Sequence, residues 1–174
     1  MQGSVTEVPM VSAGPQHGGE LADFVLAHGR SLLRLAYVLT GSRADAEDLL
    51  QDALTDAHRG WAKVAASAAP YAYVRRILLN RHTSRMRRAS AGERPVDPAG
   101  LPVGSVAAPD ERVVSDLALW QRLSALPPRM RQVLVLRYYE DLDDAAIADA
   151  LAISPGTVRS TASRALAILR EEES

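Results

Sequence analysis

Residues 143–170 have the sequence DDAAIADALAISPGTVRSTASRALAILR, and this stretch decides the fold of the carboxy-terminal part of the chain. The apolar spacing predicts a short helix over 144–151, a short turn, and a last helix over 155–170. Ser154 is the expected N-cap of the last helix and Pro155 its first residue. The residues expected to close the angle between the two helices are Ile147, Ala148, Leu151, Ile153 and Val158. The stretch is therefore predicted to be a helix-turn-helix.

The last helix has a polar outward face. Its spacing turns Val158, Ala162, Ala165, Leu166 and Leu169 inward and leaves Thr157, Arg159, Ser160, Ser163 and Arg164 outward. Small polar side chains and arginine offer the hydrogen bonds that contact base edges and phosphates in a DNA major groove. An ordinary helical hairpin with a polar outer face is the alternative, but the agreement of N-cap, turn and face composition favours DNA binding.

Upstream of this motif the apolar periodicity predicts further helices and no strand. They are expected over about 21–39, 44–57 and 71–88, and, after a break in pattern, from about Val113 and over 128–139. The fold class is therefore predicted to be all-α. The expected core residues include Leu32, Leu35, Leu39, Leu49, Leu50, Leu54, Trp61, Val74, Ile77, Leu78, Leu117, Trp120 and Leu123.

Two segments lack periodicity and are rich in glycine and proline. Residues 1–20 are expected to be a disordered arm, because they hold little apolar surface to offset the entropy of ordering. Residues 91–112 are expected to be a flexible linker. The aperiodic stretch spans roughly 80 Å when fully extended. We therefore expect two small helical domains, over 21–90 and 113–174.

The composition excludes several classes of protein. The 174 residues include no cysteine, which excludes disulfides, cysteine-based zinc sites and thiol nucleophiles. The formal net charge of -1 shows no basic tail for nucleic acid. No secretory signal or stretch of about 20 apolar residues is evident, so a soluble, cytoplasmic protein with no membrane contact is expected.

Positive charge is concentrated in residues 71–90, which hold six arginines and no carboxylate. Arg76, Asn80, Thr83 and Arg87 are spaced by four, three and four residues, so they are expected to form one polar stripe. Guanidinium and amide groups can hold phosphates and bases, with Tyr71 and Tyr73 as candidate stacking faces. A solvated arginine face is the alternative.

Negative charge is concentrated in the preceding helix, where Asp45, Asp48, Asp52 and Asp56 recur at spacings of three, four and four residues. Such a carboxylate stripe fits a docking site for a basic partner, a weak divalent-ion site, or a solubilising face. Taken alone, the pattern favours the solubilising face.

No catalytic chemistry is evident in the chain. The four histidines, His17, His28, His58 and His82, show no HExxH spacing, and no phosphate-cradling Gly-x-x-x-x-Gly-Lys loop occurs. A small helical enzyme that uses one of these histidines is the weakest alternative. We expect no enzymatic activity, no catalytic residue, no metal and no cofactor.

Three blocks carry a family resemblance: ADAEDLLQDA at 44–53, AYVRRILLN at 72–80, and the stretch from Leu126-Pro127 through RYYE at 137–140 to GTVRS at 156–160. In their order and intervals they resemble the extracytoplasmic-function group of RNA polymerase sigma factors, and within it the actinobacterial SigE-like group. The match covers about residues 21–172 apart from the linker. It implies a sigma factor that binds core RNA polymerase and directs recognition and opening of promoters.

The resemblance also implies a role for each surface. The first domain is similar to sigma-2, in which Asp48, Leu49, Gln51 and Asp52 would bind the coiled-coil clamp of the polymerase β′ subunit. The minus-10 promoter element would contact Arg76, Asn80, Ser84, Arg87 and Arg88. The second domain is similar to sigma-4, and the minus-35 element would contact Thr157, Arg159, Ser160, Ser163 and Arg164. The linker would pass along the polymerase, and the β subunit and an inhibitory anti-sigma factor are further implied partners.

Two positions depart from the family pattern, and one alternative function stays open. Many relatives have Asp at the position of Ser84 and a second basic residue at that of Thr161, so the bases contacted at each element are not implied. The alternative is a stand-alone helix-turn-helix regulator, which would normally dimerise and bind duplex DNA tightly without polymerase. The near-neutral net charge and the acidic stripe favour the sigma factor, with weak DNA binding by the chain alone.

Overall fold

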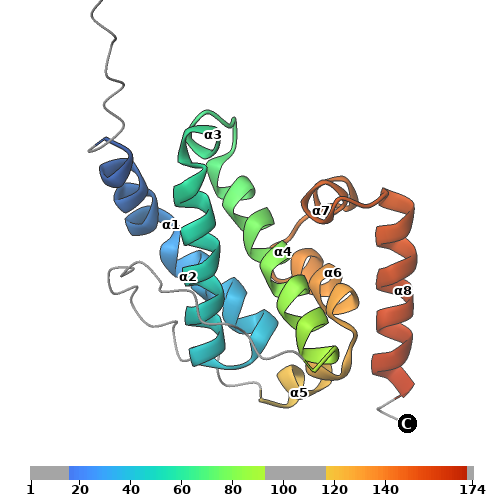
Figure 1. Cartoon of the computed structure of the whole chain (residues 1–174). Coiled ribbons are helices and arrows are strands. Elements are labelled where there is room, and N and C mark those ends of the chain that lie inside the picture. The colour runs from blue at the N-terminus through green and yellow to red at the C-terminus, as the bar shows by residue number, and fades with distance from the viewer. Residues whose placement is uncertain (1–15, 93–116, 172–174) are drawn as a thin grey trace, which may run out of the picture.

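The computed structural model describes residues 16–92 and 117–171, and these residues form helices connected by turns (Figure 1). The helices are α1 (Gln16–Thr40), α2 (Arg43–Arg59), α3 (Trp61–Ala65), α4 (Pro70–Ser90), α5 (Leu117–Ala125), α6 (Pro128–Tyr138), α7 (Asp144–Leu151) and α8 (Pro155–Glu171). No strand occurs in the described ranges, so the all-α prediction is confirmed. None of these helices combines the length and the apolar character that crossing a membrane requires.

The helix bounds differ from the sequence prediction mainly at the amino terminus. Helix α1 begins at Gln16, so the end of the predicted arm is helical, because this part continues the amphipathic helix that follows it. The rest of the arm and the predicted linker from residue 93 onward lie outside the described residues. The side chains of Leu117 and Trp120, which we expected in the core, also lie outside the described set.

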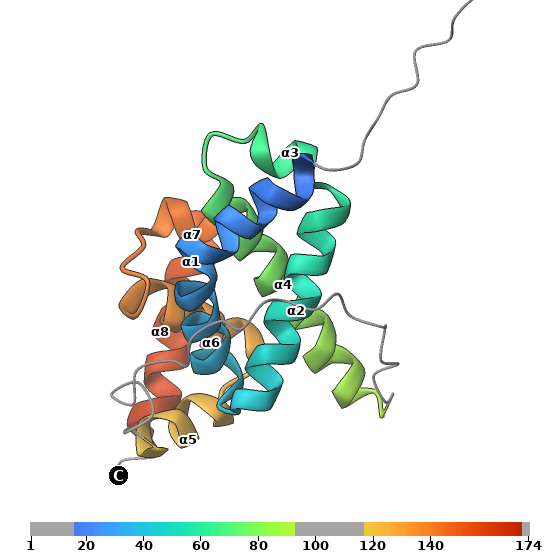
Figure 2. The same cartoon turned by 90° about the vertical axis from the view of Figure 1, so that its left-hand side faces the viewer.

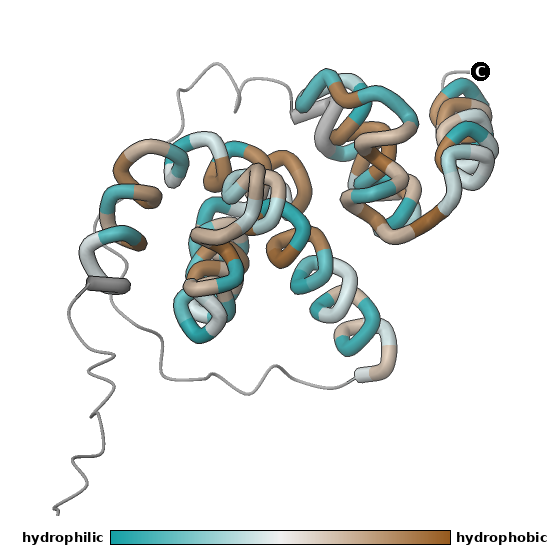
Figure 3. The backbone as a smooth tube through the Cα atoms, turned by 90° about the horizontal axis from the view of Figure 1, so that it is seen from above, coloured by the Kyte–Doolittle hydropathy of each residue, from teal (hydrophilic) through white to brown (hydrophobic). Residues whose placement is uncertain are grey.

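Helices α1 to α4 form an amino-terminal module around leucine side chains. Leu32, Leu35, Leu39, Leu49 and Leu78 are fully buried in it. Brown and teal residues alternate along the helices in Figure 3, as helices with one apolar face require. Trp61, 5% exposed, confirms its prediction as a core anchor: its indole Nε1 donates to Glu20 Oε2 at 2.9 Å and thereby ties α3 to α1.

The turn between α1 and α2 depends on two local features. Gly41 has a φ of 72°, a left-handed conformation that glycine adopts without strain, and its N–H donates to the Tyr37 carbonyl at 2.7 Å. Ser42 then caps α2, since its side chain accepts a hydrogen bond from the Asp45 N–H. The turn brings α2 back along α1, which positions the acidic residues of α2 on the surface.

Helices α5 to α8 form a carboxy-terminal module that contains the predicted helix-turn-helix, α7–turn–α8 (Figure 1). Ser154 Oγ accepts a hydrogen bond from the Thr157 N–H at 3.1 Å, which confirms Ser154 as the N-cap of α8. Ala152 in the turn has a φ of 53° and lies in the left-handed region. The Ile153 N–H donates to the Ala148 carbonyl at 3.0 Å and closes the turn.

The two modules pack together, with α6 and α7 beside α4, as Figures 1 and 2 both show. Arg131 at the start of α6 is 4% exposed and makes a hydrogen bond from Nη1 to the Leu39 carbonyl of α1 at 2.7 Å. Its Nε donates to the Leu123 carbonyl at 2.9 Å. One buried guanidinium therefore links the end of α1 to the end of α5.

Gln132, the next residue of α6, is fully buried against α4. Its amide nitrogen lies 2.9 Å from the Leu79 carbonyl and 3.1 Å from His82 Nδ1. It also lies 2.9 Å from Thr83 Oγ1, and the two N–H bonds of the amide serve two of these three acceptors at a time. The contact is thus polar and buried at once.

Glu140 makes the third contact between the modules. Its Oε2 accepts from Arg75 Nη1 at 3.1 Å and from the Tyr71 hydroxyl at 3.3 Å, both from α4. The Arg75 and Glu140 side chains are 10% and 12% exposed. Burial raises the pKa of Tyr71, and the Glu140 carboxylate adds to the effect, so the phenol stays protonated and donates. The two domains that the sequence predicts are therefore docked on each other in this structure.

We expect Ala152→Gly to stabilise the protein. Alanine in the left-handed conformation costs about 1–2 kcal/mol, and glycine avoids most of this cost. After the greater chain entropy of glycine is subtracted, the expected gain is about 1 kcal/mol, or about 2–4 °C in Tm for a chain of this size. Thermal unfolding followed by circular dichroism measures it. The control Ala167→Gly, in the middle of α8, should lower Tm, and a fall in Tm for both variants would contradict the strain argument.

We expect His82 to make stability depend on pH. Burial lowers its pKa to about 4, and the Arg131 and Arg85 guanidinium groups act in the same direction. The unfolded chain therefore binds the proton first, and the free energy of unfolding falls by up to about 3 kcal/mol as the pH drops from 6.5 to 4. Urea unfolding at several pH values measures the slope. His82→Asn keeps an acceptor for Gln132 without the titration, so an identical slope in this variant would contradict the assignment.

Candidate functional site

The outward face of α8 is the first candidate surface. Its predicted residues are all exposed: Thr157, Arg159, Ser160, Ser163 and Arg164. Val158, Ala162 and Ala165 are buried beneath them, as predicted. Thr161 is 4% exposed, so its departure from the family pattern lies under the face rather than on it. The surface offers guanidinium and hydroxyl groups on one side of a single capped helix.

Asp144 lies near one of these arginines, a contact that the sequence does not predict. Its carboxylate pairs with Arg137 at the end of α6 and lies 3.6 Å from Arg159 Nη1 on α8. The Arg159 side chain is 66% exposed, so this pair is weak and its guanidinium remains free to contact a ligand. One carboxylate at the start of α7 thus joins three helices of the module.

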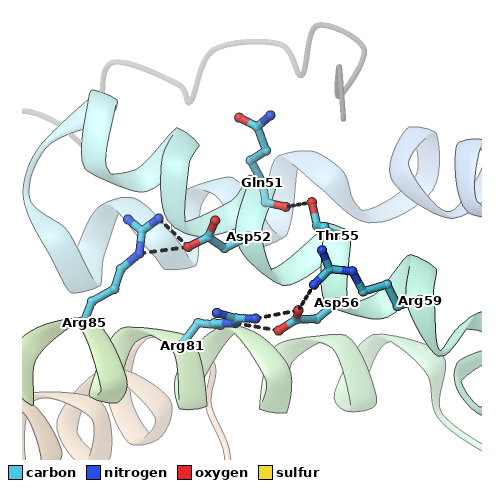
Figure 4. A network of polar contacts seen from close by, with 7 residues as sticks. All are labelled: Gln51, Asp52, Thr55, Asp56, Arg59, Arg81 and Arg85. Carbon is cyan, nitrogen blue, oxygen red and sulfur yellow. Dashed lines mark hydrogen bonds and ion pairs between the residues drawn. The ribbon is translucent and has the colours of Figure 1, made fainter. Parts of the chain in front are cut away.

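The arginines of α4 divide into a paired and an exposed group. Arg75 pairs with Glu140, as described above. Arg81 binds Asp56 with two hydrogen bonds, both at 2.5 Å, and Arg85 binds Asp52 through Nη2 at 2.6 Å (Figure 4). Arg76, Arg87 and Arg88 are exposed. Half of the positive charge that the sequence concentrates in this helix is therefore matched inside the protein.

The exposed part of α4 retains most of the predicted minus-10 residues. Arg76, Asn80, Arg87 and Arg88 face solvent, and Ser84 is half-buried. Thr83 does not belong to the exposed stripe, because its hydroxyl lies 3.3 Å from Gln132 Oε1. The prediction that Thr83 shares an exposed polar stripe with Arg76 and Asn80 is therefore wrong. Of the two tyrosines proposed for stacking, Tyr73 is 39% exposed, whereas Tyr71 is half-buried and bonded to Glu140.

The acidic stripe on α2 also divides in two. Asp45 and Asp48 are exposed, whereas Asp52 and Asp56 are half-buried and turned toward α4, as Figure 4 shows for the latter two. The pairs join 52 to 85 and 56 to 81, so the two helices run antiparallel and their four-residue spacings match. Asp52 and Asp56 thus hold α2 against α4, a role that the sequence analysis does not predict.

The other residues predicted for polymerase binding differ in accessibility. Gln51 is half-buried, and its carbonyl accepts from the Thr55 hydroxyl at 2.8 Å (Figure 4). Leu49 is 0% exposed and lies in the core, so its side chain packs α2 against the module and is not accessible to a partner. Asp48 and the exposed edge of Gln51 remain the accessible groups of this set.

Within residues 16–92 and 117–171, no three His, Asp or Glu side chains lie close enough together to hold a metal ion. His28 packs between Phe24 and Tyr71, with ring centroids 4.9 Å and 5.3 Å away and the rings tilted. His82 is buried between the modules. His28 and His82 therefore contribute to packing within the fold.

Two family models match the chain. The model described as Sigma-70 region 2 matches residues 24–92, and the one described as Sigma-70, region 4 matches residues 116–169. The first range runs from within α1 to just beyond the end of α4, and the second runs from the start of α5 to near the end of α8.

Curated relatives extend the match across both modules. The chain is 38% identical to the RNA polymerase sigma-E factor of Streptomyces avermitilis over 153 residues, which cover 88% of this chain and 84% of that protein. The sigma-E factor of Streptomyces coelicolor is 36% identical over 88% and 85%. The ECF RNA polymerase sigma factor SigM of Mycobacterium tuberculosis is 35% identical over 82% of this chain and 71% of that protein.

The fold is also similar to a solved structure. It is that of the sigma factor RpoE in complex with the anti-sigma factor NepR from Bartonella quintana, with a TM-score of 0.63 over 87% of this chain and 95% of that one. The sequence identity is 24%, so this likeness bears on the fold alone.

Proposed function

This chain belongs to the extracytoplasmic-function group of the sigma-70 family of RNA polymerase sigma factors, and we propose that three of its surfaces divide the work of such a factor. It is a sigma factor rather than a stand-alone helix-turn-helix regulator. Sigma factors are initiation factors that give RNA polymerase its promoter specificity and generally catalyse no reaction themselves. The proposal concerns which residues of this chain contact which partner.

The α8 face contacts the minus-35 element in this proposal. What supports it is the exposure of Thr157, Arg159, Ser160, Ser163 and Arg164 on the second helix of a helix-turn-helix, the element that such motifs place in the major groove. Arg159 and Arg164 supply guanidinium groups suited to guanine edges or phosphates. Thr157, near the capped end of the helix, lies where a backbone phosphate is expected.

The exposed face of α4 contacts the minus-10 element. Arg76, Asn80, Arg87 and Arg88, with the half-buried Ser84 beside them, offer cations and hydrogen bonds, and the exposed Tyr73 offers a ring on which a base can stack. Single-stranded bases are recognised by such combinations of charge and aromatic surface. Opening of the duplex would then draw on binding free energy, since separated strands bind this face better than paired ones.

The exposed part of α2 binds core polymerase. Asp48 and Gln51 are directed toward the β′ clamp coiled coil, with Asp52 at the edge of the contact and Leu49 holding the helix from the core. The segment between the modules passes along the polymerase, and the carboxy-terminal module meets the β subunit. This arrangement predicts a cytoplasmic protein.

An anti-sigma factor is a further proposed partner. The likeness to an RpoE chain solved in complex with the anti-sigma factor NepR supports the idea that this fold accepts an inhibitor.

The observation that carries the proposal is the presence of two separate exposed arginine faces, on α4 and α8, in one chain. The direct test is transcription by the pure chain with core polymerase and promoter templates, with start sites mapped after overproduction to reveal both upstream elements. The absence of any promoter-dependent transcript on cognate templates would defeat it.

We expect Arg159→Ala combined with Arg164→Ala to weaken binding of the minus-35 element. Loss of one arginine that contacts a base costs about 1–3 kcal/mol, or roughly 5- to 150-fold in holoenzyme affinity, so the double variant should lose at least this much. Competition between promoter fragments with intact and scrambled minus-35 elements measures it. Arg30→Ala, which removes an exposed arginine of α1, is the control. If the double variant still discriminates between the fragments, the orientation assigned to α8 is wrong.

We expect Asp48→Lys to weaken association with core polymerase by roughly tenfold or more, because a charge reversal opposes a basic partner surface. Asp23→Lys, on the exposed side of α1, makes the same change in net charge and should have little effect. Binding of the fluorescently labelled chain to core polymerase measures both. Equal affinities for the two variants would place the docking surface elsewhere.

A further inference from the structure

The outward face of α8 carries two arginines in different surroundings. Arg159 Nη1 lies 3.6 Å from the carboxylate oxygen Oδ2 of Asp144. Arg164 makes no ion pair within residues 16–92 and 117–171, and its Nε donates to the Ser160 carbonyl at 3.3 Å. A carboxylate therefore lies beside one of the two arginines assigned to the minus-35 element and not beside the other.

Asp144 has a fixed position on the protein. It is the first residue of α7, which the Asp143 side chain caps and which the fully buried Ile147 anchors one turn later. Arg137, at the end of α6, binds Oδ1 of Asp144, so Oδ2 is the oxygen that faces Arg159. The Asp144 and Arg137 side chains are 27% and 25% exposed. The carboxylate is thus held in place without DNA, as a group that orients a neighbouring side chain must be.

Arg159 lies where a base contact is expected. It is the fifth residue of α8, near the end of the helix that a helix-turn-helix directs at base edges, and Val158 is buried beneath it. A guanidinium carries its donors in a rigid planar fork. Because Nη1 faces Asp144, the edge formed by Nε and Nη2 is left for a pair of outside acceptors. Guanine presents such a pair, O6 and N7, in the major groove.

The same carboxylate opposes contact with phosphates. A phosphate beside Arg159 is repelled by Asp144, whereas a neutral guanine edge is repelled far less. A repulsive element against the wrong contact raises specificity even where it adds no affinity. The pair is weak in the free chain because Arg159 is 66% exposed, but it strengthens when bound DNA excludes water from around it.

We propose that Asp144 determines specificity at the minus-35 element, because it orients Arg159 toward a guanine edge and lowers the attraction of this arginine for phosphates. Asp144 acts through Arg159 and is a positioning residue. Arg164, which has no such carboxylate, contributes affinity with less dependence on sequence. This inference rests on the proposed function, since it requires that the α8 face contact DNA.

Binding of the holoenzyme to promoter fragments tests this role. The probes are a fragment from a start site mapped after overproduction, its single base-pair variants through the minus-35 element, and a version with this element scrambled. Asp144→Asn keeps the shape of the side chain and removes its charge. We expect the preference for guanine at one base pair to fall roughly three- to tenfold, a part of what loss of the arginine itself costs.

The affinity for the scrambled fragment should change in the opposite direction. Without the carboxylate, Arg159 is free to contact a phosphate, so Asp144→Asn should bind this fragment more tightly and with a salt dependence steeper by about one counterion. Asp149→Asn is the matched control: it removes the same charge from an exposed position of α7 and should leave the base preference unchanged. A parallel fall in affinity for the intact and the scrambled fragments would overturn the inference, because a loss of structure alone produces it.

A double-variant cycle separates orientation of Arg159 from general effects of charge. In an Arg159→Ala background, Asp144→Asn should no longer alter the preference at that base pair. An equal loss of preference in both backgrounds would contradict the role assigned to Asp144. If circular dichroism shows that Asp144→Asn unfolds the module, Asp144→Ser makes the same comparison with a smaller polar side chain.

Failure of the proposed function gives a different result. If Arg159→Ala by itself leaves the preference at every base pair of the minus-35 element unchanged, the assignment of Arg159 to that element fails. If Arg159→Ala removes the preference at one base pair and Asp144→Asn leaves it intact, only the role of Asp144 fails.

Discussion

The arrangement of the two modules depends on the need of one buried guanidinium for hydrogen-bond acceptors. Arg131 is almost completely buried, and a buried arginine is tolerated only when its donors are satisfied. Its acceptors are the main-chain carbonyls of Leu39, Leu123 and Ser124 in the last turns of α1 and α5, and that of Leu126 just after α5. Carbonyls in a last turn lack partners within their own helix and carry partial negative charge, so they suit a cation. The side chain at the start of α6 thus places α1 and α5 together.

Antiparallel packing of α2 on α4 decides which charges remain for partners. Two carboxylates of α2 and two arginines of α4, each pair spaced by four residues, meet across the interface as Asp52–Arg85 and Asp56–Arg81. The charges that lie beyond this contact are exposed: Asp45 and Asp48 at one end of α2, and Arg76, Arg87 and Arg88 on α4. The module therefore keeps exposed acidic groups on α2 and exposed basic groups on α4, while the charges between the two helices cancel each other.

Features that depend on neighbouring residues could be predicted from the sequence, and features that depend on distant partners could not. Ser154, Pro155 and the inward Val158 follow from local capping and spacing, and the structure confirms them. Thr83 shares the spacing of the exposed stripe, yet Gln132, nearly fifty residues later, holds it at the contact between α4 and α6. Leu49 is buried, as its apolar spacing in α2 predicts, although the family resemblance implies a polymerase contact for the same residue. The signal that could have revealed the internal ion pairs is the matching spacing at 52/56 and 81/85.

Internal pairing also explains how a DNA-contacting protein can be nearly neutral. The net charge of -1 includes arginines that are cancelled inside the fold and acids that lie on α2, away from the α8 face. Each phosphate contact contributes to affinity through counterion release, so a chain with few exposed arginines on each face has little affinity for duplex DNA by itself. Affinity must then come from simultaneous contact of both faces with one promoter, which raises the effective concentration of the second face once the first is bound. Because polymerase positions both modules in the proposed function, DNA specificity becomes a property of the assembled complex and not of the free chain.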